Sequence, residues 1–222
     1  SSVAITDNRG KDTYNLKGTQ DKKTKATTWL FQPSIIDKGS EADTYNLEYA
    51  HRFSIADFDG NKDKYNLKTS YGNITDYENG NDSYKVSGMV GKTGTYIDDQ
   101  GGKDSLILSD VKKSDIVIMA DVYKSGVYDS NAIILFNKSN NSFIYIDEFF
   151  TKDNNGDFNG FGDGVIESMK AGKKSISVDY DFLNSVRQEA SSYLSTGDTV
   201  LDALRDQDET TITNLIACFT QG

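Results

Sequence analysis

Cysteine and histidine, which build many catalytic and metal sites, each occur only once in this chain of 222 residues. Proline and tryptophan also occur once each. The single Cys218 excludes an intrachain disulfide framework and a cysteine-based zinc cluster. The single His51 argues against a histidine-rich metal site and a Ser-His-Asp triad. No stretch approaches the roughly 18 apolar residues of a membrane span, so we expect no transmembrane helix.

Apolar residues and positive charge are also scarce. Only 36% of residues are hydrophobic and the net charge is −10, so apolar burial alone barely offsets the entropy of the chain. A negative surface disfavours binding to a nucleic-acid backbone. The first residues, "SSVAITDNRG", lack the pattern of a signal peptide, and we expect them to follow a cut inside a longer protein.

The acidic residues that are present have an unusual composition, with 27 Asp against 7 Glu. A solvated helical surface would favour Glu, the better helix former. Asp suits turns and also fits compact oxygen cages for hard cations. From composition alone, a loop-rich acidic surface and a set of calcium sites are both compatible with this bias.

A short motif recurs along the first half of the chain. Its copies are "ITDNRGKDTYNL" (5–16), "IIDKGSEADTYNL" (35–47), "IADFDGNKDKYNL" (55–67), "ITDYENGNDSYKV" (74–86) and "IDDQGGKDSLIL" (97–108). The aspartates that precede the closing apolar pairs are separated by 31, 20, 19 and 22 residues. A period near 20 predicts one supersecondary unit that stacks on its neighbours. The longest gap holds residues 18–33, which we interpret as a loop or an extra coil.

Each copy predicts a turn followed by a strand. The apolar side chains that follow the closing Asp are two residues apart, so they share one face of a strand and are expected to point inward; they are Tyr14 and Leu16, Tyr45 and Leu47, Tyr65 and Leu67, Tyr84 and Val86, and Leu106 and Leu108. Glycines in the turns permit tight bends and leave carbonyls exposed. A carboxylate beside such carbonyls is typical of calcium coordination.

These copies resemble the RTX, or haemolysin-type, calcium-binding repeat G-G-x-G-x-D-x-U-x, most closely in "GGKDSLIL" (101–108) and "NGNDSYKV" (79–86). The resemblance implies a mainly β protein whose parallel β-roll holds several Ca²⁺ ions in its turns. The ligands that it implies are Asp12, Asp43, Asp63, Asp82 and Asp104, the strand-ending Asp7, Asp37, Asp57, Asp76 and Asp99, and the turn residues Gly80, Gly101 and Gly102.

The repeats also depart from the family pattern. The intervening turns "KTSYGNITD" and "SGMVGKTGTYID" lack a clear G-x-D, so one flank of the roll is expected to be metal-poor. The second and third copies carry an extra residue between Gly and Asp, which puts their calcium geometry in doubt. Tyr replaces the usual inward Leu in four copies, which predicts a wider roll or one partly filled by rings.

We expect three domains: the degenerate roll (1–110), a β capping segment (111–178) and a helical C-terminal segment (179–222) with a secretion signal. Alternating apolar residues in "DIVIMADVY", "NAIILFN" and "SFIYIDEFF" predict two or three antiparallel strands, two of them joined by the turn 138–142. The family ends its rolls with a similar capping segment, including runs such as Ile146–Phe150 and Ile166–Glu167.

The acidic segment 153–167 resembles an EF-hand loop but does not fit one, because Phe158 occupies the position where Gly is needed. A flexible acidic loop and a different calcium site remain alternatives. Farther on, Phe182, Leu183, Val186, Ala190 and Leu194 form one helical stripe. The run "TGDTVLDALRD" (196–206) predicts a second helix capped by Thr196 or Asp198, with Leu201 and Leu204 inside, and "ETTITNLIACF" predicts a short helix or strand.

The function that the resemblance implies is a non-catalytic module of a larger secreted or cell-surface protein of Gram-negative type. It would pass through type I secretion machinery unfolded and fold outside on binding calcium. The alternative is an adhesin or surface-layer segment whose roll contacts a host or neighbouring cell through Tyr71, Tyr77 and Tyr96; a receptor-binding region of a cytolytic toxin is a further alternative. No nucleophile–base pair or distinct carboxylate dyad suggests an enzyme, and we expect a monomer in isolation.

Overall fold

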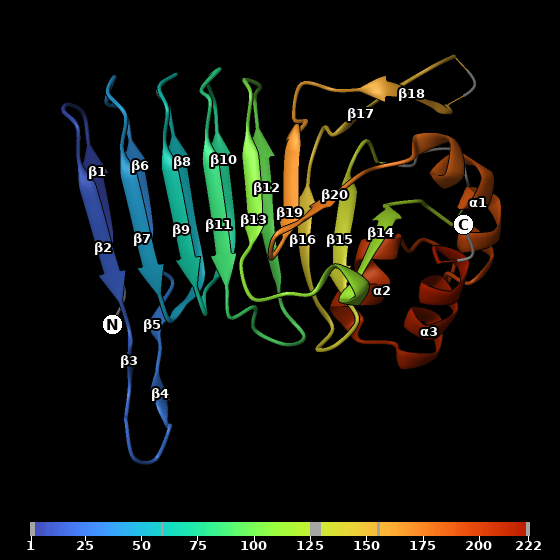
Figure 1. The fold of residues 1–222 in the computed structure, drawn as a ribbon, viewed down its shortest axis with the longest axis horizontal. Coiled ribbons are helices and arrows are strands. Elements are labelled where there is room, and N and C mark those ends of the chain that lie inside the picture. The colour runs from blue at the N-terminus through green and yellow to red at the C-terminus, as the bar shows by residue number, and fades with distance from the viewer. Residues whose placement is uncertain (1–2, 59, 125–129, 155, 221–222) are drawn as a thin grey trace.

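The computed structural model describes residues 3–58, 60–124, 130–154 and 156–220, and it is mainly β (Figure 1). The chain alternates between two sheets. In spatial order, the first sheet contains β1 (Ala4–Asp7), β6 (Ser34–Asp37), β8 (Ala50–Asp57), β10 (Tyr71–Asp76), β12 (Gly94–Asp99), β16 (Ser142–Ile146), β15 (Ile133–Asn137) and β14 (Ile116–Ala120). The second contains β2 (Thr13–Lys17), β7 (Thr44–Glu48), β9 (Lys64–Lys68), β11 (Ser83–Ser87), β13 (Ser105–Leu108), β19 (Ser168–Ala171) and β20 (Lys174–Ile176).

The repeated motif sets the strand register. From β1 to β12 the strands of the first sheet are parallel, and the isoleucine of each copy lies beside that of the next: Ile5, Ile35, Ile55, Ile74 and Ile97. The second sheet aligns Tyr14, Tyr45, Tyr65, Tyr84 and Leu106 in the same way. Each copy of the motif therefore forms one strand in each sheet and the turn between them, an arrangement compatible with a β-roll.

Tyrosine rings fill the space between the sheets. All ten side chains predicted to point inward are buried. The rings of Tyr14, Tyr45, Tyr65 and Tyr84 form a continuous stack, with successive centroids 5.1, 4.9 and 4.9 Å apart. These large flat side chains each bury a large apolar area, in a chain of which 36% is hydrophobic.

The segment 18–33 is a hairpin rather than the expected loop or extra coil. Its strands β3 (Thr19–Gln20) and β4 (Thr27–Thr28) are antiparallel and extend below the two sheets (Figure 1). The next strand, β5 (Leu30–Phe31), pairs with the start of β8. The insertion is therefore anchored to the first sheet at its end.

Beyond the repeats, the antiparallel strands expected from the sequence are present. Strand β15 pairs antiparallel with both β14 and β16, and residues 138–141 connect β15 to β16. Strand β16 also pairs parallel with β12, and β19 pairs parallel with β13. Both sheets consequently continue past residue 110, while the division into three domains stays a prediction.

The acidic segment after β16 is largely a second hairpin. Strands β17 (Phe150–Lys152) and β18 (Phe158–Phe161) pair antiparallel, and the Phe158 side chain is buried. The expected loop is therefore wrong for Phe158–Phe161, whereas the other described residues of 153–167 lie outside strands. The buried ring of Phe150, stacked on Phe158 at 4.4 Å, explains why the hairpin forms despite its Gly and Asn content.

Three helices cover one end of the sheets, beyond a 3₁₀ turn at Lys113–Asp115 (Figure 1). They are α1 (Tyr180–Ser192), α2 (Val200–Asp206) and α3 (Glu209–Cys218), and α1 contacts β14, β18 and α3. Thr199, not Thr196 or Asp198, caps α2, in a capping box with Asp202. Within the described residues, none of the helices is long and apolar enough to span a membrane.

Candidate metal centre

Ten predicted aspartates lie along one edge of the two sheets, at the turns drawn at the top of Figure 1. We call this the acidic edge. The strand-end column comprises the last residues of successive strands in the first sheet: Asp7, Asp37, Asp57, Asp76 and Asp99. The turn column comprises the residues just before the strands of the second sheet: Asp12, Asp43, Asp63, Asp82 and Asp104.

Strand geometry places the strand-end carboxylates inside the molecule. Each of these aspartates is two residues after an inward-facing isoleucine, so both side chains lie on the same face of the strand. Asp37, Asp57, Asp76 and Asp99 are at most 1% exposed. Only Asp7, in the first coil, is half-buried.

Tyrosine hydroxyls contact the strand-end column from the second sheet. Tyr65 Oη lies 2.8 Å from Oδ2 of both Asp57 and Asp76, and Tyr84 Oη donates to Asp99 Oδ2 at 2.7 Å. A phenol has one proton, so Tyr65 can donate to only one of its two carboxylates at a time. The hydroxyls therefore do not neutralise the acidic edge.

Backbone hydrogen bonds hold the turn column in order. The N–H of Asp63 donates to Oδ1 of Asp82 at 2.6 Å, and the N–H of Asp82 donates to Oδ1 of Asp104 at 2.6 Å. The same bond joins Asp12 to Asp43 and Asp43 to Asp63, each at 2.5 Å. Asp82 and Asp104 thus each fix the preceding turn with Oδ1, while Oδ2 of each has no hydrogen-bond partner among the described residues.

Glu167 continues this ladder beyond the repeats, because the N–H of Asp104 donates to its Oε2 at 2.7 Å. Residues 166–167 were noted in the sequence only as part of a capping pattern. The position of Glu167 could have been predicted from the strand that begins at Ser168. Glu167 directly precedes Ser168, just as Asp104 directly precedes Ser105, and the two strands pair with Ser168 beside Ser105.

Two groups of three buried aspartates bring the columns together. Asp57, Asp63 and Asp76 form one group, and Asp82, Asp99 and Asp104 form the other; within each, one ligand atom from every residue lies within 4.8 Å of the others. Among the described residues, Asp7, Asp12, Asp37 and Asp43 do not join such a group. The extra turn residue of the third copy therefore does not displace Asp63 from its neighbours.

The second group has unmet electrostatic requirements. Oδ2 of Asp82 and Oδ2 of Asp104 are buried without a hydrogen-bond partner. Among the described residues, no ion pair reaches Asp82, Asp99 or Asp104. Buried charges are normally paired or bound to a metal, so this group requires protons or a cation.

Burial raises the pKa values of several carboxyl groups at the acidic edge. Burial, reinforced by neighbouring carboxylates, raises the pKa of Asp76 to about 9 and those of Asp82 and Asp104 to about 7. Burial raises the pKa of Asp99 to about 6. In the first coil, by contrast, the backbone N–H groups of Arg9 and Asn8 lower the pKa of Asp7. Near neutral pH, protons and a cation would compete for the buried oxygens.

The predicted glycines allow adjacent turns to approach closely. Gly80 and Gly102 form a parallel bridge, and a Cβ on Gly102 would clash with the Gly80 carbonyl. Gly101 and Gly102 have φ values of +112° and +135°, which L side chains rarely adopt. Gly101 also donates its N–H to Asp99 Oδ1 at 3.0 Å. These three residues bring backbone groups beside the second aspartate group.

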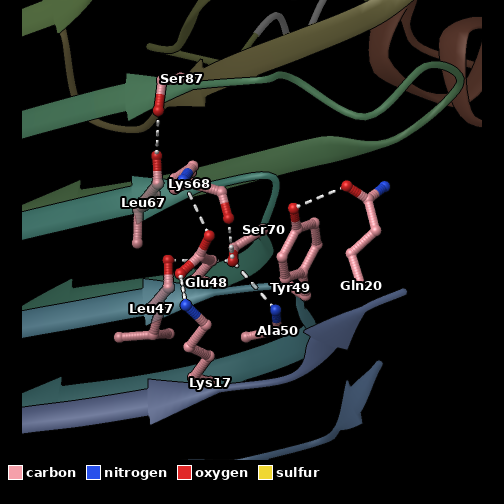
Figure 2. A network of polar contacts seen from close by, with 10 residues as sticks. All are labelled: Lys17, Gln20, Leu47, Glu48, Tyr49, Ala50, Leu67, Lys68, Ser70 and Ser87. Carbon is pink, nitrogen blue, oxygen red and sulfur yellow. Dashed lines mark hydrogen bonds and ion pairs between the residues drawn. The ribbon is translucent and has the colours of Figure 1, made fainter. Parts of the chain in front are cut away.

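The opposite edge is built from different contacts (Figure 2). Ser70 Oγ accepts the Ala50 N–H at 3.0 Å and lies near the carbonyls of Leu47 and Lys68. Nearby, Glu48 lies between Lys17 and Lys68 at 2.5 and 2.8 Å. Neither group of three aspartates lies here, which is compatible with the expected metal-poor flank.

No family model, curated protein or solved structure matches the chain. The donor set itself is informative, because the two groups offer carboxylate oxygens and contain no imidazole or thiolate. Both can hold a metal ion, and oxygen-only donors favour a hard cation. Whether the individual predicted ligands bind one stays a prediction.

Proposed function

We propose that this chain is an RTX-type calcium-binding module whose folding depends on Ca²⁺. The observation that carries the proposal is the buried group of Asp82, Asp99 and Asp104, with two carboxylate oxygens that have no hydrogen-bond partner. In this proposal the two sheets form a parallel β-roll, and ions at the acidic edge join successive turns.

Calcium suits this edge better than other common ions. It accepts about six to eight oxygen ligands at irregular angles, whereas Mg²⁺ requires near-octahedral geometry and retains its water. Three carboxylates and the nearby turn carbonyls offer the kind of oxygen-ligand set that Ca²⁺ accepts. Zn²⁺ prefers nitrogen and sulfur donors, which both groups lack.

Linkage between calcium and folding follows from the burial of the carboxylates. Without an ion, folding must bring several acids together out of water, which disfavours the folded state. Binding of Ca²⁺ to the folded state alone stabilises it in proportion to the logarithm of the free ion concentration. Extracellular calcium modules commonly bind at about 10⁻⁴–10⁻³ M, so the fold would respond to the difference between cytosol and exterior.

This behaviour suits a secreted or cell-surface protein. The chain would remain unfolded at low calcium, pass through type I secretion machinery and fold outside the cell. Helices α1–α3 would contain the segment that the machinery reads and would then cover the end of the sheets. The module has no catalytic role in this proposal; any enzymatic or toxic activity would belong to another part of a larger protein.

The test is a calcium-binding measurement by equilibrium dialysis on the full chain and on the variant Asp104→Asn. The amide retains an oxygen for the Asp82 N–H but removes one charge from the second group. The matched variant Asp206→Asn removes a charge from an exposed position outside both groups. We expect weaker binding, by about tenfold, for Asp104→Asn alone. Equal affinities of the two variants would contradict the ligand assignment.

A second candidate function is contact with another surface, and an exposed aromatic pair favours it. Phe58 and Tyr77 stack at 4.4 Å beside the acidic edge and are 42% and 47% exposed. Tyr71 and Tyr96, also expected at such a contact, are half-buried. Sedimentation at saturating calcium tests self-association through this pair: ordered assembly lost in Tyr77→Ser supports it, and a monomer throughout contradicts it.

A further inference from the structure

A basic pocket lies on the first sheet, away from the inward-facing aspartates. It has a volume of about 520 Å³, and strands β8, β10 and β12, the turn before β12 and helix α2 contribute to it. Its polar and aromatic lining includes Arg52, Lys92, Arg205, Tyr71, Asn73 and Tyr96. A volume in this range suits a small ligand or a short segment of a polymer.

Two of the three cations occupy strained backbone positions. Arg52 has φ +54° and lies at a β-bulge, where the pairing of β10 with β8 skips from His51 to Phe53. Lys92, in the turn before β12, has φ +63°. Glycine adopts this conformation freely, whereas a long side chain is strained there. Bulges often redirect a side chain at a functional site, and here both positions carry a cation that lines the same pocket.

The third cation comes from a distant part of the chain. Arg205, on α2, donates through Nε to Tyr96 Oη at 2.9 Å, and its guanidinium lies 5.0 Å from the centre of the same ring. These contacts fix both side chains at one end of the pocket. The pocket is therefore complete only when the helices have packed against the sheet.

The pocket is lined by positive charge, whereas the molecule as a whole is negative. The chain has a net charge of −10, yet Arg52, Lys92 and Arg205 are exposed and make no ion pair with a carboxylate among the described residues. By contrast, Lys17, Lys68 and Arg187 are each paired. A local concentration of positive charge in a concave site attracts an anion.

We propose that this pocket binds an acidic sugar, a uronate unit of an extracellular polysaccharide. The cations would bind the sugar carboxylates, the half-buried rings of Tyr71 and Tyr96 would contact the apolar faces of the pyranose rings, and Asn73 and Thr93 would bond to hydroxyls. A polymer with about one charge per sugar or fewer fits a pocket on an acidic protein better than a dense polyphosphate does, because the overall field repels the latter. Binding of an acidic sugar would be a second function besides calcium binding, and it names the chemical class of ligand at the proposed surface contact.

The test is calorimetric titration of the full chain in calcium with a tetrasaccharide of alternating glucuronate and N-acetylglucosamine. The neutral tetramer of N-acetylglucosamine is the matched ligand, and sodium sulfate tests for a general anion site. Circular dichroism first verifies folding of every variant, so that a failure of calcium-dependent folding is distinguished from a failure of sugar binding.

We expect the acidic tetrasaccharide to bind, the neutral one to bind far more weakly, and the affinity to fall with added salt. The double variant Arg52→Gln/Lys92→Gln should weaken binding by about tenfold or more. The matched double variant Lys64→Gln/Lys85→Gln, on exposed positions of the second sheet, should leave it unchanged. Equal binding of the neutral ligand, equal binding of sulfate alone, no binding, or equal effects of the two double variants would overturn the proposal.

Discussion

At the scale of single residues, the hydroxyl of Tyr65 links two neighbouring carboxylates of the strand-end column, Asp57 and Asp76. Its hydroxyl lies 2.8 Å from one oxygen of Asp57 and one of Asp76, all within the buried interior. We predict that Tyr65→Phe lowers the free energy of unfolding in calcium by about 1–3 kcal/mol, because a buried carboxylate loses its donor.

Urea unfolding in calcium measures this effect. Tyr49→Phe is the matched control, since Tyr49 Oη donates to exposed Gln20 at 3.2 Å on the opposite edge (Figure 2). The control is expected to cost less than about 0.5 kcal/mol. Similar losses in the two variants would show that the hydroxyl of Tyr65 has no special role in the acidic edge.

The raised pKa values predict how pH affects the calcium-free protein. Asp82 and Asp104 have folded pKa values of about 7, above the ordinary value of 3.8, so the folded state retains protons that the unfolded state releases. Their stabilising contribution is present at acidic pH and is lost as pH rises through 7; that of Asp76 is lost near 9. Without calcium, we expect a higher melting temperature at about pH 5.5 than at about pH 8.5.

Saturating calcium should reverse this order, because the ion replaces the protons and binds more tightly as the carboxyls ionise. The comparison avoids the range below about pH 5, where acids with lowered pKa values, such as Glu48 and Asp208, begin to lose their own contributions. A calcium-free protein that becomes more stable from pH 5.5 to 8.5 would contradict the assigned direction of these shifts.

At the scale of secondary-structure elements, the helices are expected to stabilise the end of the stacked sheets. Leu204 on α2 and Leu215 on α3 are fully buried, and α1 contacts β14 and β18. We predict that Leu204→Ala lowers the free energy of unfolding in calcium by about 2–5 kcal/mol through loss of burial and formation of a cavity.

Thermal unfolding followed by circular dichroism measures this effect, with Leu30→Ala, at a partly buried position of β5, as the control. If the helices stabilise the whole fold, the strand and helix signals should be lost together at a lower temperature. Loss of the helical signal alone, with the sheets unchanged, would show that the helices do not support the sheets.

The elements that were predictable from sequence are those with a local pattern. The period near 20 residues placed the turn aspartates and the inward tyrosines, and the apolar stripe predicted α1. The hairpin β3–β4 was missed because its strands are two residues long and polar. The cap of α2 was missed because Thr196, Asp198 and Thr199 are all good capping residues, and only the bond to Asp202 distinguishes Thr199.

The candidate site was less predictable than the strands, because its geometry depends on contacts between coils. The repeat identified ten aspartates, but their grouping into threes follows from the register between adjacent turns. Glu167 joins the ladder only because β19 pairs with β13, a contact between residues about sixty positions apart. The basic pocket likewise requires α2 to bring Arg205 to Tyr96.

At the scale of the whole molecule, an acidic chain folds around a column of buried carboxylates. The net charge of −10 and the 36% share of hydrophobic residues leave little surplus stability, and the acidic edge concentrates the repulsion inside the fold. Cation binding would convert that repulsion into a link between successive coils. We therefore expect cooperative folding that is controlled by calcium.

The most direct test of this account is a calcium titration of the full chain followed by far-ultraviolet circular dichroism, with magnesium at equal ionic strength as the control. The account predicts a cooperative gain of β structure and a rise in melting temperature at calcium concentrations of about 10⁻⁴–10⁻³ M, with little response to magnesium. A chain that is fully folded in chelator, and whose melting temperature does not change with calcium, would contradict it.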